Sequence, residues 1–259
     1  MTKIDKTYLD ELVERFETPD FIKDDPVQFP HGYKNKRDIE ISAFISSAFA
    51  YGNRKKIIEN LEFIHKILGE NPYEFIVNFN IDRDVEFFKG FYYRFTGEKE
   101  LIYLIHVLSQ VYKNFDSLED AFLEGYISED KNIKNSLTNF VNLLRNLLPC
   151  GEACSKSFSH LIPSPENGSA CKRLNLFLKW MIRKGPVDLH IWSKISANKL
   201  IIPLDVHVAR VSITWGLTDR KADDWKKAEE ITENLKQFDL NDPVKYDFAI
   251  FGAGITGIY

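Results

Sequence analysis

The sequence has 259 residues, of which 44% are hydrophobic, 14% aromatic and 28% charged. This length fits one large or two small domains, and the apolar content excludes a disordered or collagen-like chain. The net charge of −4 by itself argues against a nucleic-acid-binding protein, since such proteins usually carry a basic surface.

The chain carries no sequence signal for export or membrane insertion. Its first residues, MTKIDKTYLDELVERF, form a charged amphipathic pattern and not a signal peptide. No stretch of about 18 uncharged apolar residues occurs, and the three cysteines do not suggest a disulfide framework. We therefore expect a reduced, cytoplasmic protein with no membrane partner.

The hydrophobic pattern is helical along almost the whole chain. After an N-terminal helix, apolar residues recur at intervals of three and four, as in Leu101, Leu104, Ile105 and Leu108. The one strand candidate is 200–202, which Pro203 ends. The sequence therefore predicts an all-α protein. In chain order, helices are expected over about residues 38–51, 54–69, 83–92, 98–113, 117–126, 130–148 and 170–183, with another beginning at 205.

Charge is unevenly distributed along the chain. Residues 172–227 contain 12 Lys and Arg against five Asp, a net charge of +7, so the other residues sum to −11. A basic segment on an acidic body can bind a polyanion locally. The alternative is that these residues are simply the solvated faces of helices.

Lys172 is the first candidate for chemistry. Ser169 is expected to cap a helix, which places Lys172 in the first helical turn. The positive end of the helix dipole lowers the pKa of a lysine there, and a neutral lysine is a nucleophile that forms Schiff bases. The alternative is an ordinary surface lysine.

Asp205 is the second candidate, within Pro203-Leu204-Asp205-Val206-His207-Val208-Ala209-Arg210. As the predicted N-cap of the next helix, its carboxylate is held ionised and in a fixed direction. Such a group is suited to steady a developing positive charge or to accept a proton. Capping alone would also explain this aspartate, and His207 has the alternative of a satisfied polar residue between domains.

Together these two segments resemble the helix-hairpin-helix DNA glycosylase superfamily, which includes endonuclease III and the 8-oxoguanine glycosylases. Asp205-x-His207-Val-x-Arg210 is similar to the catalytic-aspartate motif, and Lys172-x-x-Asn175-x-x-Leu178 to the lysine helix of its bifunctional members. The resemblance implies that Lys172 attacks the deoxyribose C1′ and that Asp205 activates the lysine and stabilises the sugar cation. Over its full length the chain is identified as a member of the bacterial DUF2400 family.

The resemblance also implies residues that contact DNA. The helix ending before Asn53 and Arg54 is similar to one that places an amide beside a flipped nucleotide, and Gly90-Phe91-Tyr92-Tyr93-Arg94 is similar to a segment of the 8-oxoguanine branch. Phe91, Tyr93 and Trp192 are expected to sandwich the base. The full set of expected substrate or DNA contacts is Asn53, Arg54, Tyr93, Arg94, Gly168, Ser169, Arg173, Asn175, Trp192, His207 and Arg210. For Tyr92 and Tyr93, core packing is the alternative.

The sequence departs from the superfamily in three places. The glycine-rich hairpin is replaced by Pro165-Glu166-Asn167-Gly168-Ser169, which keeps one glycine and adds an acid. The segment 185–202, which contains Trp192, lengthens the interval between Lys172 and Asp205. No cysteine follows Cys171, so no iron–sulfur cluster is expected. The spacing of Cys150, Cys154, His160 and Cys171 differs from that of compact zinc sites, and we expect no metal and no cofactor.

We therefore expect a monomeric enzyme of base excision repair: a DNA glycosylase, with or without AP-lyase activity, that acts on a damaged base such as an oxidised purine. Its two helical lobes would be residues 38–199 and residues 1–37 with 200–259, with Lys172 and Asp205 facing each other across a central cleft. The alternatives are a non-catalytic binder of damaged or structured nucleic acid on the same scaffold, and a helical protein-interaction module.

Overall fold

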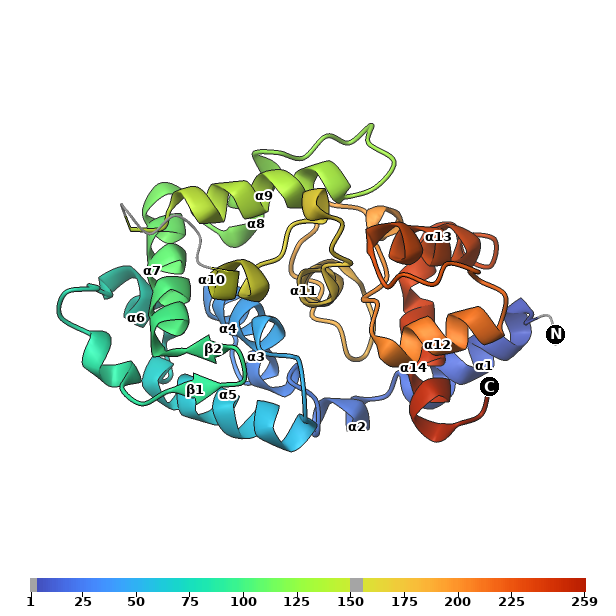
Figure 1. Ribbon diagram of the computed structural model, residues 1–259, viewed down its shortest axis with the longest axis horizontal. Coiled ribbons are helices and arrows are strands. Elements are labelled where there is room, and N and C mark those ends of the chain that lie inside the picture. The colour runs from blue at the N-terminus through green and yellow to red at the C-terminus, as the bar shows by residue number, and fades with distance from the viewer. Residues whose placement is uncertain (1–3, 150–155) are drawn as a thin grey trace. The chain divides into compact units, whose positions relative to one another are not determined.

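The computed structural model describes residues 4–149 and 156–259, which are mostly helical (Figure 1). This helical content confirms the prediction of an all-α protein. Strand structure among the described residues is limited to the short antiparallel pair β1 (Tyr92–Tyr93) and β2 (Thr96–Gly97). The segment 200–202, expected as a strand, is buried and belongs to no strand.

The chain divides into two compact units, each with its own core. Unit 1 comprises residues 1–25, 128–133 and 165–259, and unit 2 comprises 26–127 and 134–164. This division differs from the expected lobes, because residues 165–199, which include Lys172, belong to the same unit as Asp205.

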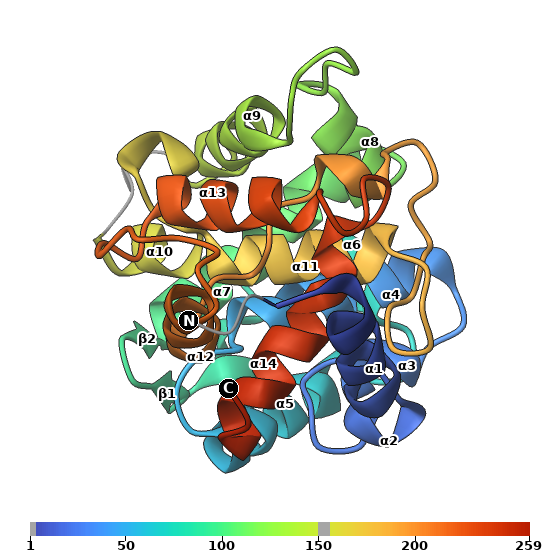
Figure 2. The ribbon, with the colours of Figure 1, turned by 90° about the vertical axis from the view of Figure 1, so that its right-hand side faces the viewer.

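Unit 1 is built around its C-terminal helix. This helix, α14 (Asp247–Thr256), packs between α1 (Lys6–Phe16) and α12 (Val206–Thr214), as Figure 2 makes visible. A Cβ atom at Gly252 would lie 2.2 Å from the Phe16 ring, and one at Gly254 would lie 2.8 Å from the His207 Cβ. These glycines therefore allow the close packing of three helices. The elements of unit 1 are α1 (Lys6–Phe16), α2 (Pro19–Ile22), η2 (Pro165–Asn167), α11 (Lys172–Ile182), η3 (Ala197–Lys199), α12 (Val206–Thr214), α13 (Trp225–Leu235), η4 (Pro243–Tyr246) and α14 (Asp247–Thr256).

Unit 2 packs around α4, whose residues from Asp38 to Ala48 are all buried. The Glu40 carboxylate inside this core accepts hydrogen bonds from the Tyr112 hydroxyl and the Leu118 backbone amide, each 3.0 Å long. A buried carboxylate is tolerated where such donors surround it. The elements of unit 2 are α3 (Gln28–His31), α4 (Lys36–Ala48), α5 (Arg54–Leu68), α6 (Pro72–Asn78), η1 (Val85–Phe88), β1, β2, α7 (Glu98–Asn114), α8 (Leu118–Leu123), α9 (Lys134–Asn146) and α10 (Lys156–Leu161).

Candidate functional site

Asp205 is the N-cap of α12, as its sequence position predicts. Its Oδ1 atom accepts hydrogen bonds from the backbone amides of His207 and Val208, each 2.9 Å long. Its Oδ2 atom accepts no hydrogen bond from the residues that the structure describes. One oxygen therefore fixes the carboxylate to the helix, and the other is left to act on a ligand.

Lys172 is the first residue of α11, so its expected position in the first turn is correct. The expected capping residue is wrong, because the N-cap is Cys171 and not Ser169. Cys171 is buried and has the left-handed backbone conformation, with φ of 48°. Its carbonyl accepts the Asn175 backbone amide at 2.9 Å, and the Ser169 hydroxyl accepts the Cys171 amide at 3.2 Å. This turn replaces an ordinary cap and directs the chain into α11.

Lys172 and Asp205 line the same pocket in unit 1. The cleft that was expected between two lobes is thus a pocket within one unit. Its empty space, counted together with the open solvent at its mouth, is about 460 Å³. From α11, Lys172, Leu176 and Lys179 reach it, at the spacing of one helix face. The remaining lining residues are Phe21, Asp25, Trp180, Pro203, Asp205, Asp247, Phe248 and Phe251.

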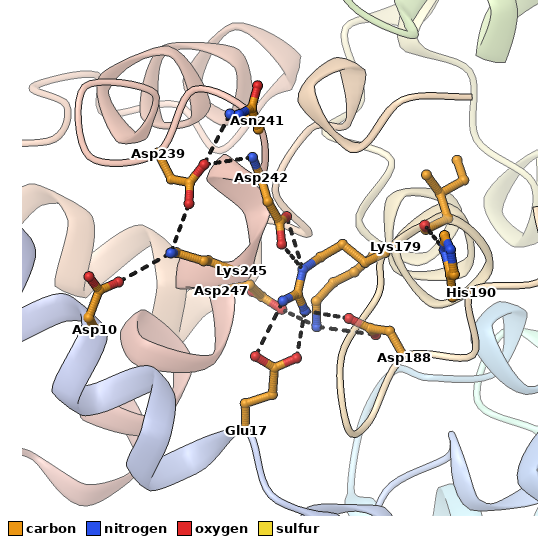
Figure 3. A network of polar contacts seen from close by, with 12 residues as sticks. Asp10, Glu17, Lys179, Asp188, His190, Asp239, Asn241, Asp242, Lys245 and Asp247 are labelled. Atoms are coloured by element: carbon orange, nitrogen blue, oxygen red, sulfur yellow. Dashed lines mark hydrogen bonds and ion pairs between the residues drawn. The ribbon is translucent and has the colours of Figure 1, made fainter. Parts of the chain in front are cut away.

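The pocket contains a second pair of charged residues, Lys179 and Asp247. The Lys179 Nζ atom lies 3.1 Å from the Asp247 carboxylate (Figure 3). It also lies 3.6 Å from the centre of the Phe248 ring. Burial raises the pKa of the Asp247 carboxyl, against the opposing effect of Lys179. The charges of Lys172 and Asp205 also act on Asp247, which indicates that all four groups belong to one electrostatic unit.

Sequence reasoning missed Lys179, Asp247 and Asp25. A signal for Lys179 was present, since it follows Lys172 by two helical turns and so shares its face. Asp247 lies 42 residues after Asp205, at the start of α14, and its place in the pocket depends on how α14 packs. No local pattern marks it as a site residue.

The other expected DNA contacts of unit 1 fall into exposed and buried groups. Gly168 and Arg210 are exposed, and Ser169 and His207 are half-buried. The Gly168 carbonyl accepts the Trp225 backbone amide at 3.0 Å, and the Arg210 guanidinium donates to the Gly254 carbonyl at 3.1 Å. Arg173 and Asn175 are buried. The Asn175 side-chain amide donates to the Ala170 carbonyl at 3.0 Å, which gives it a structural role in the turn before α11.

Trp192 does not line the pocket, in contrast to its expected place beside the base. Its side chain is fully buried and packs edge-on against the Phe177 ring, with centroids 5.3 Å apart. Its backbone amide donates to the Met181 carbonyl at 2.9 Å, which ties the segment after α11 to that helix. This residue therefore belongs to the core of unit 1.

We expect Trp192→Ala to lower the free energy of unfolding by about 3–5 kcal/mol, because it removes a buried aromatic side chain. Urea denaturation measures this loss. Trp192→Phe keeps most of the packing and should lose clearly less stability. A stable Trp192→Ala protein with a selective loss of ligand binding would contradict the structural role.

Four expected contacts lie in unit 2. Asn53 caps α5 by accepting the Lys56 amide at 3.3 Å, and the exposed Arg54 is the first residue of that helix. Tyr93 is buried, and its hydroxyl donates to the Tyr51 carbonyl. Arg94 is exposed, with φ of 54°, at the turn between β1 and β2. Phe91, which was expected beside the base, is buried against Phe49 and Phe63.

The basic segment 172–227 exposes less positive charge than its sequence indicates. Four of its twelve Lys and Arg residues are buried: Arg173, Lys179, Arg183 and Lys227. One of them, Arg183, is paired with three carboxylates, those of Glu17, Asp188 and Asp242. These four residues therefore add little to a surface that could bind a polyanion. Two cations of the segment, Lys172 and Lys179, line the pocket.

No cluster of three or more His, Cys, Asp or Glu side chains suited to a metal ion occurs in residues 4–149 and 156–259. Cys150 and Cys154 lie outside the described residues. His160 packs against Tyr51 and Phe95 in unit 2. Cys171 in unit 1 is buried, and its thiol donates a hydrogen bond to the Ser169 carbonyl at 3.4 Å.

Within the described part of the chain, none of the helices has the length and apolar character needed to span a bilayer.

Comparison with known proteins identifies the family. Searches found no match among curated proteins and none among solved structures. Residues 25–256 match the model of a family described as a protein of unknown function, DUF2400. The chain, with its Lys172–Asp205 pocket, therefore belongs to the DUF2400 family.

Proposed function

We propose that this protein is a DNA glycosylase with AP-lyase activity, which removes a damaged base after flipping it out of the duplex. The observation that carries the proposal is that Lys172 and Asp205 line one pocket together with aromatic walls. An amine nucleophile and a fixed carboxylate are the two groups that this chemistry requires.

The reaction assigns one role to each group. Lys172 first transfers a proton to Asp205, and its neutral Nζ attacks the deoxyribose C1′. The bond between C1′ and the base breaks, and its electron pair leaves with the base, which takes up the proton held by Asp205. Asp205 is then again a carboxylate and stabilises the positive charge that develops on the sugar. The bond between C1′ and the ring oxygen then opens, the oxygen takes a proton from the attached nitrogen, and a protonated Schiff base results. Loss of a C2′ proton expels the 3′ phosphate and cleaves the strand.

The remaining lining residues suit a flipped base. Phe21, Trp180, Phe248 and Phe251 supply flat apolar surfaces, on which aromatic bases stack. Lys179 supplies a hydrogen-bond donor and Asp247 an acceptor at the same pocket. A purine presents donors and acceptors on one edge, and an oxidised purine adds further polar groups, so this class of lesion is our preferred substrate.

A single-turnover assay tests the proposal. Duplexes that contain 8-oxoguanine, uracil or an abasic site are incubated with the protein, with and without borohydride, which reduces a Schiff base to a stable adduct. We expect base release from at least one lesion and a covalent adduct with it. Salt-dependent binding of these duplexes without base release or an adduct would replace the proposal by the alternative of a non-catalytic binder. Absence of any binding even at low salt would exclude both.

A further inference from the structure

A buried group of charged residues adjoins the pocket in unit 1, because two of its members, Lys179 and Asp247, line that pocket. Figure 3 shows this group. It contains two cations and four carboxyl groups, and we call it the buried charge cluster. The side chains of both cations are almost fully buried, at 2% and 3% exposure. The members of the cluster are Glu17, Lys179, Arg183, Asp188, Asp242 and Asp247.

Lys179 is shared between two of these carboxylates. Its Nζ atom lies 3.1 Å from Asp247 and 3.8 Å from Asp188. Asp247 lines the pocket, whereas Asp188 is not one of its lining residues and has a fully buried side chain. Asp188 is therefore placed to act on the pocket only through the ammonium group that it shares with Asp247.

Arg183 forms ion pairs with three carboxylates of the cluster. It lies 2.5 Å from Asp188, 2.8 Å from Glu17 and 2.9 Å from Asp242. One cation thus contacts three carboxylates, and Asp188 competes with both others for it. The Asp188 Oδ1 atom accepts no hydrogen bond among the described residues, although it is completely buried.

The cluster has an excess of negative charge if every carboxyl group is ionised. Burying an unbalanced charge is costly, and a buried carboxyl group reduces the cost by binding a proton. Asp188 is the most buried of the four and faces Lys179 and Arg183 from α11 and Glu17 from the end of α1. Burial raises its pKa to about 6, although the two cations act in the opposite direction.

We propose that Asp188 is a positioning residue that controls, through Lys179, how strongly the Asp247 carboxylate in the pocket accepts hydrogen bonds. When Asp188 is ionised, its negative charge attracts the Lys179 ammonium group, which then interacts less strongly with Asp247. The Asp247 carboxylate is then more available to accept hydrogen bonds from a ligand. When Asp188 is protonated, the Lys179 ammonium group interacts mainly with Asp247. The Asp247 carboxylate is then a weaker hydrogen-bond acceptor for a ligand. The part of this inference that concerns the ligand rests on the proposed function, because there Asp247 would accept hydrogen bonds from the N–H groups of a base.

The coupling is measured first on the free protein, without DNA. Carbon-13 NMR of the aspartate side-chain carboxyl groups follows each titration, and Asp188→Asn and Asp247→Asn assign the two signals. We expect the Asp247 signal to change at the same midpoint as Asp188, at about pH 6. This change should be missing from Asp188→Asn. An Asp247 signal that is insensitive to the ionisation of Asp188 would overturn the inference.

Two further variants separate the coupling from a general effect on the fold. Glu17→Gln removes a negative charge that raises the pKa of Asp188, so its midpoint should move to lower pH. Asp223→Asn is the matched control, because Asp223 pairs with Lys227, 2.7 Å away, outside the buried charge cluster. It should leave the midpoint unchanged. Equal midpoints in Glu17→Gln and the wild type would count against the assignment to Asp188.

Stability provides an independent measurement of the same titration. The pKa of Asp188 is raised from 3.8 to about 6 in the folded protein, so the folded state keeps a proton that the unfolded state has already lost. Between these two pH values the wild type should therefore lose stability, relative to Asp188→Asn, as the pH rises. Urea unfolding at several pH values measures this difference, which should be constant above about pH 7. A difference that is constant throughout would overturn the inference.

The excision assay then tests the consequence for the ligand. On the substrate identified above, the wild-type rate should fall as the pH drops through about 6, with a slope that approaches tenfold per pH unit for a single proton. Asp188→Asn should lack this part of the profile and resemble the low-pH wild type. If no lesion is excised but the NMR signals are coupled, the proposed function fails while the coupling stands. If excision occurs and both proteins share one pH profile, the inference fails while the proposed function stands.

Discussion

Lys172→Gln is expected to form no covalent adduct with an abasic duplex under borohydride and to lose strand cleavage by a factor on the order of 10³ or more, about 4 kcal/mol of transition-state stabilisation. The reason is that glutamine keeps a polar, unbranched stem at the start of α11, one atom shorter than that of lysine, but has no nucleophilic amine. Single-turnover strand cleavage and gel analysis of the trapped adduct measure both effects.

Lys184→Gln is the matched control for this result. Lys184 is exposed and follows the same helix, so its replacement removes one positive charge from the same region without touching the pocket. We expect its adduct yield to equal that of the wild type. If Lys172→Gln still gave the adduct in full yield, another amine would be the nucleophile, and the assignment of Lys172 would be wrong.

Asp205→Asn is expected to lower the rate of base release by about 10²–10⁴-fold, the range for loss of a positioned acid–base group. Asparagine caps helices about as well as aspartate, so the two amide hydrogen bonds to residues 207 and 208 have a replacement acceptor. The variant therefore removes the charge and the proton acceptor while α12 keeps its cap. The free energy of unfolding should change by less than about 1 kcal/mol.

Two comparisons make this prediction specific. Asp224→Asn makes the same change in another capping residue of unit 1, which accepts the Lys227 amide at 3.0 Å and lies outside the pocket. It should keep the wild-type rate. Asp205→Ala should lose the rate and, in addition, about 1 kcal/mol of stability. An Asp205→Asn protein with the wild-type rate would mean that Asp205 is only a helix cap.

Helices with a strong apolar repeat and a clear cap were predictable from the sequence. The helix expected over 54–69 is α5 (Arg54–Leu68), which begins after the capping residue Asn53. The helix expected over 98–113 is α7 (Glu98–Asn114). Both have local signals at their ends, and these signals depend on few distant contacts.

Elements that depend on distant contacts were not predictable in the same way. The helix expected over 83–92 is instead η1 followed by β1, because Tyr92 and Tyr93 pair with Gly97 and Thr96. In the pocket, the motifs around Lys172 and Asp205 identified two residues. The partnership of Lys179 with Asp247 joins residues that are 68 positions apart in the sequence, and it requires the packing of α11 and α14 that no local pattern encodes.

The placement of the pocket residues has a consequence for the order of events during protein synthesis. Phe21 and Asp25 leave the ribosome first, and Asp247, Phe248 and Phe251 on α14 leave it among the last residues of this sequence. Unit 2, which ends at residue 164, is complete long before α14 appears. At about 5–20 residues per second, several seconds separate the emergence of Lys172 from that of Asp247. Lys172 is therefore made before Asp205 and Asp247, and the pocket is complete only after α14 has emerged.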